Sequence, residues 1–557
     1  PQPQLKKVLK NACFYFVHQI ATLEHYKTVC AKLNAATKDR GIKKHTVRHT
    51  LRRMFIKYSL IKIREKHSLT HLENTHRVDA SQLNNAEIAQ HILKQQGIFV
   101  DARGMGAGKT EVMGLVAEQV KKRDINQRKV VYICPRVSLA SGGAKRLDLR
   151  YYEDVQTYWG ESSDRLSVCI NSIPKHGITD TNCLMLDEFR QMLEFISIGS
   201  VKNRQEVQDT LIEAINNAET VILADADFND FSLQWLQEHT NKTIQVIQAQ
   251  GSTHQKQITT LADSESLLVE ANKQLQDGKN IWITSDSKIQ VHKSALAFNL
   301  LAEDMQGDFD LDEEEILIIT GDNKGEAKQA AFLKNPDEES KKYRLIISTP
   351  VISSGVSITN DHFEKIYALF SNVVPANEMI QAIGRVRAVK DIQVAFKKGH
   401  IQAREIEQQA LLDGEQLKNS RFLGGRLYEV DALAYQQAQI TASLNDSLNN
   451  FSQEFLILAQ IKGYTIKKKA ITHKIQGLNK RASEKDIQRV LTATPIAEET
   501  AKQLKRNKPD TQAERDSLDR YLVEEMAGKP SPDLNAEDIQ FYKNQGSTTI
   551  QNHELIH

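Results

Sequence analysis

The chain has 557 residues, 40% of them hydrophobic and 26% charged, so it is long enough for three or four domains with sizeable cores. No apolar run reaches the length of a membrane span and no signal peptide is visible, so we expect no membrane partner and a cytoplasmic location. The five cysteines are scattered without a CxxC pair, which gives no sign of a zinc site or a disulfide framework. Because the sequence begins at Pro1 rather than Met, we expect it to be a piece of something longer.

The charge is unevenly distributed along the chain. Residues 1–70 carry 16 Lys and Arg against 3 Asp and Glu, a net charge of +13, whereas the rest carries a net charge of −11. A basic module on a mildly acidic body indicates a polyanionic partner for the N-terminus. The alternative is a merely solvated basic face.

Residues 1–72 are predicted to be helical and to bind DNA. Apolar residues recur at helical spacing around Gly41, where a turn is expected: Val29, Leu33, Val47, Leu51 and Met54. The sequence from Tyr26, YKTVCAKLNAATKDRGIKKHTVRHTLRRM, resembles the helix-turn-helix of large serine recombinases. That resemblance implies a recognition helix at about Lys44–Phe55, which would present to duplex DNA the side chains of Lys44, Arg48, Arg52 and Arg53. Residues 73–80 are predicted to be a linker.

Strand and helix patterns alternate from residue 81 to residue 400, which is typical of parallel sheets with crossover helices. The predicted strands are Ile98–Val100, Val130–Cys134, Val168–Asn171, Leu184–Asp187, Val221–Ala224, Gln257–Leu261, Ile281–Thr284, Ile316–Ile319, Leu345–Ser348, Lys365–Phe370 and Ile392–Phe396. We therefore expect an α/β protein with two tandem RecA-like lobes, residues 81–250 and 251–400. A helical accessory region is expected at 401–557, loosely ordered after residue 526.

The segment Arg103–Thr110, RGMGAGKT, has the residues of a phosphate-binding loop at a helix start. The small residues Gly104, Gly106, Ala107 and Gly108 allow backbone N–H groups to turn around the triphosphate of ATP. Lys109 can reach the β- and γ-phosphates, and the Thr110 hydroxyl can bind Mg²⁺. The strict pattern has glycine where this chain has Arg103.

Two acidic strand ends follow the loop. In LMLDEFR, Asp187 is expected to hold Mg²⁺ through water, and Glu188 to orient and deprotonate the attacking water. The next strand ends in ADADF, where Asp225 and Asp227 are expected to contact the network of Glu188 or the second lobe. A strand end with solvated aspartates is the alternative for this last pair.

The predicted second lobe carries two further motifs. In STPVISSGVS, Thr349 and Ser353 are candidate contacts to a nucleic-acid backbone, and Gly355 permits close approach of a phosphate or sugar. In QAIGRVRA, Gln381 precedes Arg385 and Arg387, which are candidate arginine fingers for the γ-phosphate.

Together, DARGMGAGKT, LDEFR, ADADF, TPVISSGVS and QAIGRVR resemble superfamily 2 helicases over about residues 81–400. They look most like herpesvirus origin-binding helicases and like plasmid and phage replication helicases, some of them fused to a primase. The chain departs from the family at Ala388, where the last motif usually has arginine, and at Ser357, where an aspartate is usual. Gln82 is the counterpart of the family's adenine-reading glutamine.

The resemblance implies ATP- and Mg²⁺-dependent movement on DNA and a role in initiating replication, with duplex bound by the N-terminal module and single strand across the lobes. Replication proteins or a primase are the expected protein partners, in a bacterial, plasmid or phage context. An RNA helicase is one alternative. Another is an ATP-gated DNA-binding scaffold that remodels a complex without processive unwinding.

Overall fold

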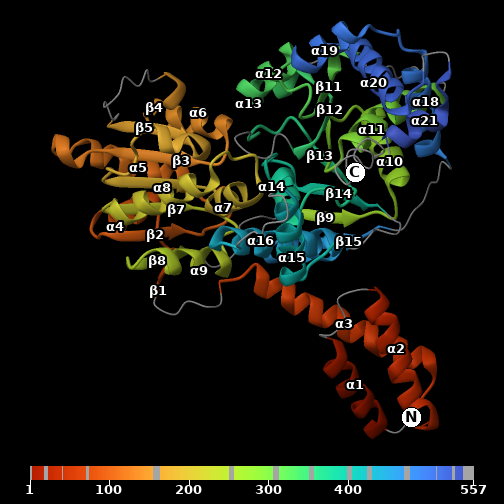
Figure 1. Cartoon of the computed structure of the whole chain (residues 1–557), viewed down its shortest axis with the longest axis horizontal. Helices are drawn as coiled ribbons and strands as arrows, with labels where there is room; N and C mark the ends of the chain where they lie inside the picture. The colour runs from red at the N-terminus through yellow and green to blue at the C-terminus, as the bar shows by residue number, and fades with distance from the viewer. Residues whose placement is uncertain are drawn as a thin grey trace. The chain divides into compact units, whose positions relative to one another are not determined.

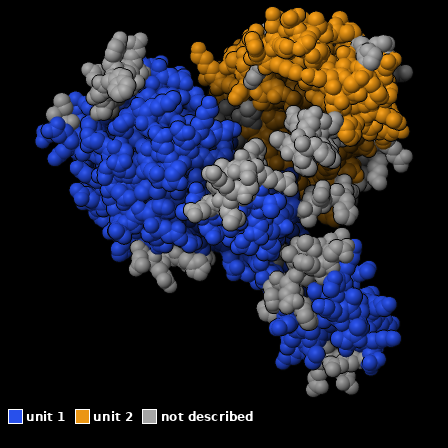
Figure 2. Space-filling view, in the orientation of Figure 1, with its two compact units in different colours: residues 1–254, 375–377, 400–463 blue, residues 255–374, 378–399, 464–557 orange. Residues whose placement is uncertain are grey.

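The computed structural model describes residues 3–17, 23–40, 42–69, 75–154, 164–249, 256–304, 313–350, 357–397, 404–422, 430–469, 477–507, 509, 511–529 and 533–543. The chain divides into two compact units (Figure 2). Unit 1 comprises residues 1–254, 375–377 and 400–463, and unit 2 the remaining residues to 557. Within the described segments, no helix is long and apolar enough to cross a lipid bilayer.

Unit 1 is built on a parallel sheet with the strand order β1-β8-β2-β7-β6-β3-β5-β4. The strands are β1 (Thr75–Asp79), β2 (Gly97–Asp101), β3 (Val130–Cys134), β4 (Arg150–Tyr151), β5 (Arg165–Cys169), β6 (Cys183–Asp187), β7 (Thr220–Ala224) and β8 (Ile244–Gln248). The central strands β2, β3 and β7 are buried along their whole length, as parallel strands covered on both faces must be.

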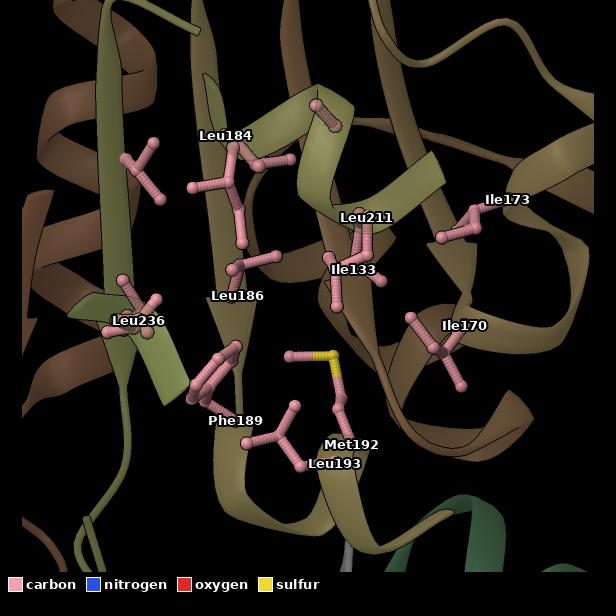
Figure 3. Packing of buried hydrophobic residues seen from close by; sticks show 14 of the residues in the cluster. Ile133, Ile170, Ile173, Leu184, Leu186, Phe189, Met192, Leu193, Leu211 and Leu236 are labelled. Atoms are coloured by element: carbon pink, nitrogen blue, oxygen red, sulfur yellow. The ribbon is translucent and has the colours of Figure 1, made fainter. Parts of the chain in front are cut away.

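Helices cover both faces of this sheet, because alternate strand residues point to opposite sides. One face packs on α4 (Asn85–Leu93), α5 (Lys109–Lys121) and α6 (Val137–Arg146), and the other on α7 (Phe189–Ile198), α8 (Arg204–Asn217) and α9 (Asp230–His239). Figure 3 shows the second face, where Leu184 and Leu186 of β6 lie among side chains of the helices, including Phe189 and Leu193 of α7. This packing fixes the end of β6, where the acidic pair follows.

The N-terminal segment of unit 1 forms α1 (Pro3–Val17), α2 (Leu23–Thr37), the short 3₁₀ turn η1 (Lys38–Arg40) and α3 (Lys44–Lys66). The helices α1, α2 and α3 lie side by side (Figure 1). They share a small core of Leu9, Cys13, Val29, Leu33, Val47 and Leu51. The apolar periodicity therefore identified core residues, but the helix after the turn runs to Lys66 rather than ending near Phe55. Gly41 lies outside the described residues.

Unit 2 holds a second parallel sheet with the order β11-β12-β10-β13-β14-β9-β15. Its strands are β9 (Gln257–Thr260), β10 (Ile281–Ser285), β11 (Ile316–Ile319), β12 (Leu345–Ser348), β13 (Lys365–Phe370), β14 (Asp391–Phe396) and β15 (Thr465–Lys468). Helices α10 (Ser264–Gln276), α11 (Lys288–Asp304) and α18 (Leu478–Thr492) pack on one face through a common apolar core. The expected α/β fold with two parallel sheets is confirmed, in an arrangement consistent with tandem RecA-like lobes.

The remaining elements are mostly helical. They are α12 (Ala327–Lys334), α13 (Pro336–Glu339), α14 (Ala376–Gly384), α15 (Gln408–Phe422), α16 (Ala432–Asn449), α17 (Phe451–Ile461), α19 (Glu498–Asn507), α20 (Gln512–Ala527), α21 (Ala536–Phe541), and the 3₁₀ turns η2 (Ile125–Gln127), η3 (Tyr152–Asp154), η4 (Ile170–Lys175), η5 (Glu313–Glu315) and η6 (Ser340–Lys342).

Several sequence-based expectations for individual elements were wrong. The expected linker at 73–80 contains β1, which pairs with β8 at the sheet edge. The strand expected at Val168–Asn171 lies earlier, at Arg165–Cys169, because the chain turns into η4 at Ile170. The region after residue 400 is largely helical but also supplies β15, which pairs with β9 of the second sheet.

Candidate functional site

The phosphate-binding loop connects the buried strand β2 to α5, so backbone N–H groups at the start of α5 face the loop. Gly106 and Gly108 adopt positive φ angles of 77° and 78°. The left-handed backbone at Gly108 favours glycine, and a Cβ there would also displace the side-chain amide of Asn85. The Lys109 ammonium donates to the carbonyls of Arg103 at 2.8 Å and Gly104 at 3.0 Å, which places it inside the loop.

Lys109 lies near a group of carboxylates that follow three neighbouring strands. Burial lowers the pKa of Lys109, and the charges of Asp101, Glu188, Asp225 and Asp187 oppose that shift. Asp101 ends β2, Asp187 ends β6 and Asp225 follows β7, and these strands are adjacent in the order β2-β7-β6. The carboxyl ends of parallel strands meet at one edge, where α/β proteins generally bind ligands.

Arg103 does not point toward the loop's interior. Its Nε and Nη2 donate to the two oxygens of Asp101 at 2.8 and 2.7 Å, and Nη1 donates to Asn85 Oδ1 at 3.0 Å. Both members of the pair are almost fully buried, with side-chain exposures of 6% and 1%. The departure from glycine at this position is therefore matched by a bidentate buried ion pair.

Asp187, the last residue of β6, and Glu188, which follows it, each make a hydrogen bond to a neighbouring strand. The Tyr132 hydroxyl of β3 donates to Asp187 Oδ2 at 2.6 Å, which orients that carboxylate. Glu188 adopts a left-handed backbone conformation, φ 56° and ψ 54°, at the N-cap of α7. Its N–H donates to the carbonyl of Ala224 at 2.8 Å, so the strained residue is tied to the end of β7.

Asp225 and Asp227 hold the segment after β7. The backbone N–H groups of Arg190 and Asp227 each donate to Asp225 at 2.7 Å. Burial and the neighbouring charge of Asp227 raise the pKa of Asp225 to about 6. Asp227 accepts from Lys462 Nζ at 2.6 Å. Asp225 therefore accepts a hydrogen bond from the backbone of Arg190, two residues after Glu188.

The donor set at this edge suits a magnesium nucleotide better than a protein-only metal site. Among the described residues, no group of three or more His, Cys, Asp or Glu side chains is arranged to hold a metal ion. Mg²⁺ usually takes one or two protein ligands and completes its shell with phosphate oxygens and water. The Thr110 hydroxyl in the first turn of α5 and the Asp187 carboxylate fit that requirement.

In unit 2, the backbone at Ile358, just after the first motif, pairs with the backbone around Val386 in the second motif. The Ile358 N–H donates to the carbonyl of Arg385 at 2.9 Å, and the Arg387 N–H donates to the carbonyl of Ile358 at 2.8 Å. Arg385 is half-buried and Arg387 exposed. The buried Lys256 donates to the Val386 carbonyl at 2.9 Å, and burial together with the charge of Arg387 lowers its pKa to about 8.

Other predicted residues of unit 2 are more dispersed. Gln381 is buried in α14, and Thr349 is buried directly after β12. Ser353 and Gly355 lie outside the described residues. Lys109, Thr110, Asp187 and Glu188 belong to unit 1, whereas Gln381 and the two arginines belong to unit 2.

The predicted DNA contacts lie on the first part of α3. Lys44, Arg48, Arg52 and Arg53 are all exposed on this helix. Gln82 is also exposed, in the turn between β1 and α4.

Sequence reasoning missed the residues that support the site. Asn85, Tyr132 and Lys462 had no assigned role, because each contacts a residue distant in the chain. Asp101 also had none, although its partner Arg103 is only two residues away. One signal was present for Asp101: an aspartate at the end of an apolar strand, two residues before an arginine at a glycine position.

A curated protein and several solved structures are similar to this chain. The curated "Putative replication origin-binding protein" of Acanthamoeba polyphaga mimivirus is 24% identical over 304 residues. The match spans 51% of this chain and only 35% of the mimivirus protein. No family model matches the sequence.

Several solved structures of helicases are also similar to this chain. The DEAD-box helicase Mss116 bound to ssRNA and UDP-BeF matches with a TM-score of 0.45 and 12% identity, over 84% of this chain and 87% of Mss116. The Mycobacterium smegmatis helicase Lhr bound to ssDNA and AMP-PNP matches with a TM-score of 0.40 and 12% identity, over 64% of this chain and 53% of Lhr.

Proposed function

We propose that the chain is an ATP-dependent DNA helicase or translocase of the replication-initiation type. The observation that carries the proposal is the convergence, at one edge of the unit 1 sheet, of the glycine-rich loop with Lys109 and the acidic pair Asp187 and Glu188. A flexible backbone cradle, one cation and two carboxylates with separate supports are the parts that phosphoryl transfer to water requires.

Each residue has a distinct task in this proposal. Backbone N–H groups of the loop and the start of α5 bind the phosphates, and Lys109 neutralises charge on the β- and γ-oxygens. Thr110 and Asp187 would hold Mg²⁺, which when bound supplies further charge neutralisation between these phosphates. Glu188 orients the attacking water and accepts its proton. Arg385 and Arg387 act from unit 2 on charge that develops at the γ-phosphate.

DNA is the proposed track for two reasons. The net charge of +13 on residues 1–70 suits a polyanion, and exposed cations lie on α3. The name of the mimivirus relative refers to a replication origin, which is a DNA site. The N-terminal helices would grip duplex DNA while the two units move on a single strand, alongside replication proteins or a primase.

The first test is Lys109→Ala, which removes the cation that the loop supplies to the phosphates. We expect ATP turnover to fall to background in a phosphate-release assay, while the unfolding temperature stays close to that of the wild type. Lys121→Ala, at the exposed end of the same helix, is the matched control and should keep its activity. Near-normal turnover in folded Lys109→Ala protein would remove the nucleotide site from this loop.

The second test asks whether the protein moves on DNA or on RNA. Strand displacement on forked DNA and forked RNA should be measured side by side with ATP, using Lys109→Ala as the blank. Displacement of DNA alone supports the proposal. Preference for RNA contradicts the choice of track, and ATP turnover without displacement on either substrate favours an ATP-gated remodeller.

A further inference from the structure

A buried ionic cluster in unit 1 lies outside the nucleotide-binding loop and involves the last turn of α3. Its centre is Glu454 of α17, whose side chain is 1% exposed. Glu454 pairs with His67 Nε2 at 2.7 Å and with Lys66 Nζ at 3.4 Å. Lys66 also donates to the Ser443 carbonyl at 2.8 Å and to Asp446 at 3.2 Å. The end of α3 is therefore fastened to α16 and α17.

The same cluster extends to the residues after the acidic pair. Arg190, two positions after Glu188, is buried, donates from Nε to Glu194 at 3.0 Å, and lies within electrostatic range of Glu454. Its backbone N–H donates to Asp225. Lys462, at the C-cap of α17, pairs with Asp227. Thus α17 contacts the end of α3 through Glu454 and the segment after β7 through Lys462.

The other end of α3 carries the exposed cations. The helix is continuous from Lys44 to Lys66, a length of about 35 Å at 1.5 Å per residue. Arg48 and Arg52 lie near its start, and Lys66 and His67 lie at its end. Because α3 is one continuous helix, a ligand that displaces or rotates its start would also move Lys66 and His67 at its end, next to Glu454.

We propose that Glu454 is a positioning residue that couples the occupancy of the basic helices α1–α3 to the nucleotide site through Lys66, His67 and Arg190. The inference rests on the proposed function, because it needs ATP at the loop and DNA at the basic helices. A buried carboxylate whose cationic partners move away is strongly disfavoured. A change in the position of α3 therefore changes the free energy of the arrangement around Arg190 and Asp225. DNA on α3 and ATP at the loop would then each shift the affinity for the other.

Coupling between two binding sites is reciprocal, which gives a sharp measurement. The experiment uses the full chain carrying Glu188→Gln, which should bind ATP without consuming it. Fluorescence anisotropy of a labelled duplex gives the DNA Kd with and without ATP, and a fluorescent ATP analogue gives the nucleotide Kd with and without duplex. We expect each ligand to change the other's Kd by the same factor, at least about five-fold.

Adding Glu454→Gln should reduce that factor to below about two-fold while leaving both separate Kd values nearly unchanged. Asp486→Asn is the matched control, because Asp486 is also a buried carboxylate with two cationic partners, Arg489 and Lys543, but lies in unit 2. It should leave the coupling factor intact. If Glu454→Gln unfolds, Lys66→Gln and His67→Gln take its place, and each should lower the coupling factor.

The outcomes separate the two proposals. Failure of the Glu188→Gln parent to bind ATP or duplex overturns the proposed function, and the coupling proposal with it. Binding of both ligands without mutual influence in the parent overturns the coupling proposal alone. A coupling factor that persists in Glu454→Gln, or one that falls equally in Asp486→Asn, also overturns it.

Discussion

Arg103 illustrates how a single residue can depart from a motif without destroying it. A cation within a phosphate-binding loop would be expected to compete with Lys109 for the phosphates. Here the guanidinium is bound by both oxygens of Asp101 and by Asn85, so its charge is neutralised on the strand side of the loop. The side chain therefore stabilises the loop's base, and Lys109 remains the cation inside the loop.

Asp101→Asn should consequently destabilise unit 1. Removing one partner of a buried pair leaves an uncompensated charge, which costs about 3–5 kcal/mol. The free energy of unfolding from urea titration measures this effect. Asp148→Asn is the control, since Asp148 pairs with Lys121 in an exposed bridge that solvent screens. Equal destabilisation of the two variants would contradict a structural role for the Arg103 pair.

The buried ion pairs of Glu454 should make the free energy of unfolding depend on pH. Burial alone would raise the pKa of Glu454, but the hydrogen bond from His67 and the charges of Lys66, His67 and Arg190 lower it from 4.5 to about 2. A carboxylate with a depressed folded pKa stabilises the fold above its unfolded pKa, and this contribution disappears as the pH falls through the folded pKa.

The stability gap between wild type and Glu454→Gln should therefore narrow as the pH falls from 4.5 toward 2, by up to about 3 kcal/mol. Urea unfolding of both proteins over a pH series measures the gap. Gln453→Ala, at an exposed neighbouring position without an ionisable group, should show a constant gap. A gap for Glu454→Gln that stays constant or widens on acidification would contradict the ion-pair account.

At the scale of elements, most strands were predictable, including the edge strand β11, whereas β1, β15 and the buried strand β8 were not. The strand β3 (VVYIC), for example, is a continuous apolar run, because both faces of a parallel sheet are covered. By contrast, β1 (THRVD) and β15 (TIKK) have little apolar character, and only their pairing with β8 and β9 makes them strands. The loop and the acidic pair were predictable from local motifs, whereas Tyr132 and Lys462 reach the site only through tertiary packing.

The length of α3 changes how the basic module should be tested. Deleting residues 1–72 would remove Lys66 and His67 along with the basic surface, and so disturb Glu454. Arg48→Ala combined with Arg52→Ala is cleaner, because both side chains are exposed and lie one helical turn apart.

This double variant should bind duplex DNA more weakly and with a flatter salt dependence. The slope should fall by about 0.9 log unit of affinity per log unit of salt for each phosphate that the variant no longer neutralises. Anisotropy titrations at several salt concentrations measure the slope. Lys341→Ala with Lys342→Ala removes the same charge from an exposed site in unit 2 and should leave the slope unchanged. Unchanged affinity and slope in the α3 variant would make its basic face a plain solvated surface or a protein-docking site.

For the whole molecule, the proposed chemistry is divided between two separately folded units. Unit 1 supplies the loop, Lys109, Asp187 and Glu188, and unit 2 supplies Arg385 and Arg387. Each unit has its own sheet and its own core. If the two units act together on ATP, substitutions in either unit should lower ATP turnover.

Arg385→Ala and Arg387→Ala should each lower ATP turnover far more than ATP affinity, because a finger acts on charge that develops in the transition state. Where arginine fingers have been measured, the reduction is about 10³–10⁵-fold. Turnover with DNA present and nucleotide Kd are measured on the same preparations, and Lys390→Ala, an exposed cation near the motif, is the control. Normal turnover in both arginine variants would show that unit 2 does not complete the site.

The pairing of β9 with β15 has a consequence for how the protein is made. These strands are neighbours in the second sheet, yet about 200 residues separate them in the chain. At a synthesis rate of about 5–20 residues per second, one edge of β9 waits roughly 10–40 s for its partner to leave the ribosome. An open strand edge is a template for pairing with other chains. The nascent chain thus passes through an interval prone to aggregation, which ends when β15 arrives and places Lys467 and Lys468 along the finished edge.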